Sequence, residues 1–230
     1  MILCLETATN LCSVALCDRN GVVVSRESSD TKSHASLLTV FVLEALSEAG
    51  IKAGDLEAVA VSKGPGSYTG LRIGVSTSKG ISFAASIPLI GIDTTFSMFC
   101  GMRAQHDKDS DVLYCPVLDA GRMEVYYAIY DCEGNTVKET GAEIIDENSF
   151  RDVLAEKHLF IFGTGASKLK SVLTDPRIII EENFRLSASH LRKPAFKALE
   201  KRKFEDVAYF EPLYLKDFIA TKSKKSILGI

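Results

Sequence analysis

A glycine-rich loop at residues 64–74 is the part of this sequence whose residue types most clearly predict a special backbone. It reads GPGSYTGLRIG, follows an apolar run and opens a helical pattern. Ser67 and Thr69 can cap the free N–H groups of that helix, and loops of this kind often hold a phosphate. The spacing lacks both the Walker signature and the third glycine of a dinucleotide fingerprint. We therefore predict a structural loop formed by Gly64, Pro65, Gly66, Ser67, Gly70 and Arg72.

Two predicted strands end in carboxylates that could face each other across a cleft. Glu6 ends the first strand and is followed by hydroxyl side chains, and Asp119 ends a later strand. The segment at Glu6 resembles the first phosphate loop of actin-like ATPases, and Asp119 could hold a hydrated metal ion. The candidate cofactor-binding residues of this degenerate nucleotide cleft are Glu6, Thr7, Thr9, Asp119, Gly163 and Gly165.

The same segments have plainer interpretations. The hydroxyls after Glu6 can finish a strand end, Asp119 can pair with Arg122 or cap a turn, and residues 163–165 can form an ordinary strand-to-helix turn. No carboxylate pair suits general acid and base catalysis, and Ser67 lacks the flanking glycines of a nucleophile elbow. The four histidines lack the spacing of metal ligands. We therefore predict no catalytic residue and no metal ligand.

The composition is ordinary for a globular protein. Hydrophobic residues make up 46% and charged residues 25% of the 230 residues, and the net charge of −3 gives no general attraction for nucleic acid. The six cysteines form no Cys-x-x-Cys pair, and we expect them to be reduced, buried side chains in a reducing cytosol. No signal peptide is visible, and the most apolar stretch, residues 81–92, is too short to span a bilayer. We expect a cytoplasmic protein that does not enter a membrane.

Residues 192–225 are locally basic, with ten Lys or Arg against five Asp or Glu. Such a stretch can be a solvated helix and tail, or it can contact RNA or an acidic partner. No aromatic platform is interleaved with these charges, which favours the solvated helix and tail.

The elements that must position these loops occur twice. Glu6 recurs as Asp119 and the turn at residues 18–21 recurs at residues 131–134, both at an offset of 113. Each half continues with a helix, a strand and a helix, and the second half is expected to have its first helix at residues 148–156. This pattern predicts an α/β protein with two lobes, residues 1–103 and 104–230, each a mixed sheet covered by helices.

Two helices of the first lobe carry unusually little polar surface. The helix at residues 34–49 has one apolar stripe for the sheet and further apolar side chains outside it, and the helix at residues 71–86 has a face of small residues. Either the two helices pack on each other, or they dock on a partner. The residues of the expected partner interface are Leu37, Val40, Phe41, Leu43, Ile73, Ser76, Thr77, Gly80 and Phe83.

Two motifs carry a resemblance to a known family. Residues 64–74 match GPGSFTGLRIG except for Tyr68, and residues 119–126 match DARRxEVY except for Gly121. The segments at residues 3–9, 163–165 and 214–216 also fit, so the resemblance covers nearly the whole chain. The sequence resembles the TsaB (YeaZ) family, the dimerization subunit of the bacterial machinery that makes threonylcarbamoyladenosine in tRNA.

The resemblance implies an actin-like ATPase fold (ASKHA, ribonuclease H-like) with two lobes from an internal duplication. It implies a scaffold that pairs with a TsaD-like catalytic subunit through the two helices, recruits a TsaE-like ATPase and meets tRNA only through the complex. A homodimer through the same helices is also compatible. No cofactor of its own is expected, because ATP and a metal belong to the partner subunits. TsaD-like subunits carry a His-x-x-x-His site, which this chain lacks after His34.

Two other functions stay open. One is an autonomous actin-like ATPase or kinase that holds ATP between Glu6, Asp119 and Gly163. The other is a metallo-type glycopeptidase homologue, which requires bound zinc or iron.

Overall fold

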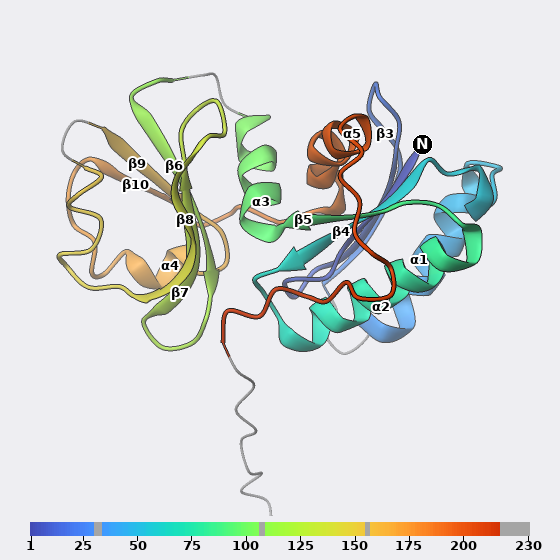
Figure 1. Ribbon diagram of the computed structural model, residues 1–230. Coiled ribbons are helices and arrows are strands. Elements are labelled where there is room, and N and C mark those ends of the chain that lie inside the picture. Colours follow the sequence, from blue (N-terminus) through green and yellow to red (C-terminus); the bar gives the residue numbers. More distant parts are fainter. Residues whose placement is uncertain (30–33, 106–108, 155–156, 217–230) are drawn as a thin grey trace, which may run out of the picture.

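Two five-stranded sheets with the same strand order form the frame of the molecule (Figure 1). The computed structural model describes residues 1–29, 34–105, 109–154 and 157–216. The first sheet has the order β3-β2-β1-β4-β5, and the second has the order β8-β7-β6-β9-β10. The predicted α/β architecture and its duplication are therefore confirmed by the strand order.

The first sheet is antiparallel on one side of its central strand and parallel on the other. Its strands are β1 (Ile2–Glu6), β2 (Cys12–Cys17), β3 (Val22–Ser28), β4 (Ala58–Gly64) and β5 (Leu89–Asp93). In β1, Leu3 lies opposite Leu16 of the antiparallel neighbour β2 and opposite Val59 of the parallel neighbour β4. Because β1 is the central strand, the loop that follows Glu6 leaves the sheet at its centre.

The second sheet repeats this arrangement. Its strands are β6 (Val112–Asp119), β7 (Glu124–Tyr130), β8 (Thr136–Ile144), β9 (His158–Phe162) and β10 (Ile178–Glu181). Strand β6 pairs antiparallel with β7 and parallel with β9, as β1 does with β2 and β4. Asp119 thus ends the central strand of its sheet, in the position that Glu6 has in the first.

Helices cover both faces of the first sheet, so its inner strands β1, β2 and β4 are buried on both sides, whereas the edge strand β3 is largely exposed. Helices α1 (His34–Glu48) and α2 (Tyr68–Ala85) pack on one face and contact each other. The other face is covered by the short turn η2 (Ala188–Leu191) and helix α5 (Arg192–Glu200). Residues 188–200 were assigned from the sequence to the second lobe, but they pack against the first sheet. A further short turn, η1 (Ala53–Asp55), precedes β4.

Helix α3 (Thr94–Arg103) lies between the two sheets (Figure 1). Its buried Met98, Phe99 and Met102 join apolar side chains of the second sheet in one core cluster, which also includes Leu71 of α2. The ring of Phe99 lies 5.6 Å from the ring of Tyr114, measured between centroids. An apolar core therefore holds the two lobes together around α3.

The outer face of the second sheet is covered by turns and by the short helix α4 (Ala166–Leu169). The helix expected at residues 148–156 was wrong, because residues 147–153 form turns; residues 155–156 lie outside the described residues. Phe150 has a φ of 68°, which interrupts a right-handed helix. Its ring packs against Tyr127 at 5.3 Å between centroids. Burial of this ring outweighed the local helical pattern.

We expect Phe99→Ala to lower the free energy of unfolding by about 3 to 5 kcal/mol, because it empties the core between the lobes. Phe204→Ala is the control, since the Phe204 side chain is 42% exposed. Urea unfolding of both variants measures the difference. Equal losses in the two variants would contradict the assignment of α3 as the centre of an inter-lobe core.

Candidate functional site

The carboxylate of Glu6 points into the protein and is fully buried. Its Oε1 accepts a hydrogen bond from the N–H of Ala8 at 2.7 Å, and its Oε2 accepts one from the hydroxyl of Ser62 on β4. Burial raises the pKa of Glu6 from 4.5 to about 7, although these hydrogen bonds act to lower it. In this structure Glu6 ties the end of β1 to β4, and its carboxylate is not open to a ligand.

The glycine-rich loop lies directly on the segment that follows Glu6. The N–H of Ser67 donates to the carbonyl of Ala8 at 2.7 Å, and the Ser67 hydroxyl accepts from the N–H of Gly70 at 3.2 Å. The Ser67 cap expected from the sequence is therefore confirmed. A Cβ atom at Gly70 would overlap the carbonyl oxygen of Thr7, so only glycine permits this approach.

The two hydroxyl candidates of the first segment lie in the same turn. Thr7 is fully buried, and its hydroxyl lies against the backbone of Gly74. Thr9 is half-buried, and its hydroxyl accepts from the N–H of Leu11 at 3.3 Å. The first turn of α2 thus occupies the space beside β1 in which the sequence suggested a ligand.

Asp119, in the second lobe, pairs with a lysine that no sequence pattern indicated. Its carboxylate forms an ion pair with Lys168 of α4 and accepts from the N–H of Gly121 at 2.9 Å. Burial acts to raise the pKa of Asp119, but the Lys168 ammonium and the Gly121 N–H outweigh it, so that pKa is lowered. Asp119 therefore caps its turn, as one sequence interpretation had it, and pairs with Lys168 rather than with Arg122.

Gly163 and Gly165 shape the turn between β9 and α4. Gly163 has a φ of 116°, and a Cβ there would overlap the Met98 side chain of α3. Gly165 lies close to the backbone of Asp119, whose N–H donates to the Thr164 hydroxyl at 3.2 Å. The structure thus brings Asp119 and residues 163–165 together in one lobe, and Glu6, Thr7 and Thr9 together in the other.

Within the described part of the chain, no group of three or more His, Cys, Asp or Glu side chains could hold a metal ion. None of the helices described is both long enough and apolar enough to cross a bilayer.

The surface of α1 and α2 carries exposed apolar side chains. Val40 and Leu43 of α1 are 42% and 68% exposed, and Phe83 of α2 is 79% exposed. We call these three residues the apolar patch. Of the other expected interface residues, Ser76 and Gly80 are exposed, whereas those that are half-buried are Leu37, Phe41, Ile73 and Thr77. Phe41 and Ile73 pack against the core of the first lobe, and α1 contacts α2. The other interpretation of the sequence, in which the two helices pack on each other, therefore also holds.

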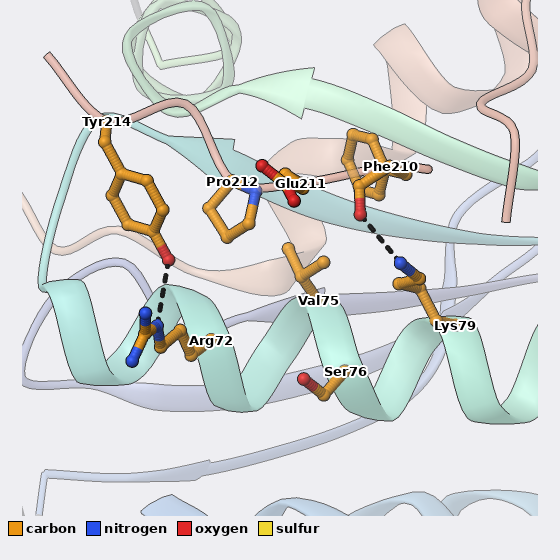
Figure 2. A pocket seen from close by; sticks show the side chains of 8 residues that line it. All are labelled: Arg72, Val75, Ser76, Lys79, Phe210, Glu211, Pro212 and Tyr214. Atoms are coloured by element: carbon orange, nitrogen blue, oxygen red, sulfur yellow. Dashed lines mark hydrogen bonds between the residues drawn. The ribbon is translucent and has the colours of Figure 1, made fainter. Parts of the chain in front are cut away.

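A segment near the C-terminus runs along α2 and borders a pocket of about 240 Å³ (Figure 2). Lys79 reaches from α2 to the carbonyl of Phe210 at 2.8 Å, and the Nε of Arg72 donates to the hydroxyl of Tyr214 at 3.3 Å. The ring of Tyr68 lies 4.8 Å from that of Tyr214, between centroids. We call residues 205–214 the strap. Motif residue Arg72 therefore binds the strap, a role that its position in the loop did not indicate.

Comparisons with known proteins agree across both lobes. A family model described as TsaD: tRNA N6-adenosine threonylcarbamoyltransferase matches residues 19–209. The tRNA threonylcarbamoyladenosine biosynthesis protein TsaB of Escherichia coli (strain K12) is 29% identical over 230 residues, 96% of each chain. The protein of that name from Buchnera aphidicola subsp. Schizaphis graminum is 30% identical, over 74% of this chain and 81% of its own. The solved structure of YeaZ from Pseudomonas aeruginosa has a TM-score of 0.79 at 23% identity and covers 93% of this chain and 99% of its own.

We expect Glu6→Gln to change how stability depends on pH. Because the folded-state pKa of Glu6 is raised, its stabilising contribution is complete below about pH 4.5 and is lost as pH rises to about 7. The variant should therefore gain about 3 kcal/mol over the natural protein between pH 4.5 and pH 8. Urea unfolding at both pH values measures this, with the exposed Glu139→Gln as control. A gain that is the same for both variants would contradict the buried carboxyl.

We expect Gly70→Ala to destabilise the protein by roughly 1 to 3 kcal/mol, because the new methyl group displaces the segment after Glu6. Gly80→Ala is the matched control on the same helix, since a Cβ there meets nothing within 4 Å. It should stabilise the protein by roughly 0.5 to 1 kcal/mol through the helix preference of alanine. Thermal unfolding of the two variants should shift in opposite directions, and shifts of the same sign would contradict the close approach at Gly70.

Proposed function

This chain belongs to the TsaB (YeaZ) family, and from that membership we propose that it is a non-catalytic scaffold subunit for making threonylcarbamoyladenosine in tRNA. Its relatives from Escherichia coli and Buchnera aphidicola bear the name of that biosynthesis. In this proposal the chain works in the cytoplasm, pairs with a TsaD-type catalytic subunit and helps to recruit a TsaE-type ATPase. ATP and the metal are supplied by those partners.

The observation that carries the proposal is the apolar patch on α1 and α2. Large apolar side chains scattered singly are normal on a protein surface, but Leu43 and Phe83 lie on two helices that contact each other. Gly80 of α2 adds an exposed position without a side chain, at which another backbone can approach closely. A partner helix laid on this pair would cover apolar surface that water now contacts.

The two candidate nucleotide-site carboxyl groups support a scaffold rather than an autonomous ATPase. Glu6 is buried against Ser62, and Asp119 is paired with Lys168. An ATPase or kinase needs such carboxylates to hold a hydrated cation. Here each carboxyl group already has a protein donor or cation as its partner, so both are engaged within the protein.

The same patch also suits a second copy of the chain. A homodimer through α1 and α2 would cover the patch until the catalytic subunit is present, because both occupants need the same residues, Val40, Leu43 and Phe83. In this proposal the two assemblies compete for one surface.

We expect Leu43→Glu combined with Phe83→Glu to weaken pairing with the TsaD-type subunit at least about hundredfold, because buried charges would replace two apolar contacts. Phe41 is left unchanged, since it packs against the core. Calorimetry with the purified partner measures the affinity, and circular dichroism checks the fold.

The control is Val137→Glu combined with Ile144→Glu, which makes the same charge change at exposed apolar positions of β8 in the other lobe. The control should pair like the natural protein. Unchanged pairing of the Leu43 and Phe83 variant would contradict the proposed interface.

A further inference from the structure

Helix α5 and the residues after it present a concentration of positive charge on the first lobe. Residues 192–203 contain six Lys or Arg and one Glu, in a chain with a net charge of −3. We call the following residues the basic face: Arg19, Arg192, Lys193, Lys197, Lys201, Arg202 and Lys203. Because α5 and α1 pack on opposite faces of the first sheet, the basic face lies away from the apolar patch.

The basic face surrounds a shallow hollow of about 300 Å³. On one side, the Arg19 guanidinium lies 5.0 Å from the centre of the Phe196 ring and pairs with Glu200 at 2.7 Å. Arg192 donates to the carbonyl of Arg19 at 2.8 Å. The two guanidinium groups are therefore held in place by the protein.

The lysines on the other side of the hollow are available to an outside anion. Lys193 and Lys197 are exposed and line the hollow. Within the described residues, no carboxylate forms an ion pair with either lysine, whereas Arg19 has Glu200 and, at 3.8 Å, Glu57. The hollow thus combines two ordered guanidinium groups with two ammonium groups that pair with no carboxylate of the described residues; Glu200, which also lines the hollow, pairs with Arg19.

Two of these charges oppose the dipole of the helix, whereas Lys197 lies in the last turn, where the dipole favours a cation. Arg192 and Lys193 occupy its first turn, where the helix dipole disfavours cations, and no acidic residue lies there. Lys197 follows Lys193 by four residues and precedes Lys201 by four, so like charges repel along one side of the helix. A solvated helix would be more stable with acidic residues at the first two positions. This arrangement favours a bound anion as the reason for the charges.

We propose that the basic face binds the phosphate backbone of RNA, which rests on the proposed role of the chain in tRNA modification. Residues four apart on a helix rise about 6 Å, comparable to the spacing of successive phosphates along an RNA strand. Phe196 is buried under Arg19, so the hollow offers no exposed aromatic ring on which a base could stack. Binding is therefore to phosphates, independent of sequence and strongly dependent on salt.

The test compares two variants with the same change in net charge. Lys193→Gln combined with Lys197→Gln removes two charges from the basic face. Lys52→Gln combined with Lys170→Gln removes two exposed charges elsewhere. Each full-length chain is mixed with its TsaD-type partner, and its affinity for fluorescently labelled, unmodified tRNA is measured by anisotropy at several salt concentrations. A sizing column reports pairing with the partner independently of RNA.

We expect the variant of the basic face to bind tRNA at least about tenfold more weakly at 0.1 M salt, with a salt slope shallower by about 2. The control variant should match the natural chain. Equal affinities and slopes in all three proteins would overturn the inference, and retained pairing would show that the scaffold role still stands.

A polyglutamate peptide is tested in parallel. If the variant of the basic face loses affinity only for this peptide, the face binds an acidic protein and the inference is also overturned.

Discussion

The close contact between the glycine-rich loop and the segment after β1 is the constraint on which the first lobe depends. Gly70 lies against the carbonyl of Thr7, and Ser67 donates to the carbonyl of Ala8. This contact fixes the start of α2, and therefore the direction in which α2 lies beside α1. It also closes the space next to Glu6. The same backbone contact thus removes a possible ligand site and positions a helical surface.

The C-terminal part of the chain stabilises this arrangement from outside. The strap binds α2 through Lys79 and Arg72, and α5 covers the face of the first sheet that α1 and α2 leave free. The first lobe is therefore completed by residues that follow the second lobe in sequence. Because α3 packs between the sheets as well, the two lobes share cores rather than a single hinge.

The sequence predicted most of the frame and part of the site. The offset that relates Glu6 to Asp119 predicted two equivalent sheets, because turn residues and strand lengths are local properties. The recognised family and its actin-like fold were likewise confirmed by the comparisons. Long-range contacts could not be predicted: nothing near Lys168 indicated Asp119, 49 residues away, and no periodicity indicated that α5 would return to the first sheet.

We propose that this chain uses its candidate nucleotide-site residues for its own packing and its outer helices for a partner. Hydrogen exchange followed by mass spectrometry tests it most directly, on the chain alone, with ATP and with the TsaD-type subunit. The account predicts new protection in peptides of α1 and α2 with the subunit, and no change at residues 6–9 or 119–124 with ATP. Protection of those two segments by ATP alone, with none on the helices when the subunit is added, would contradict it.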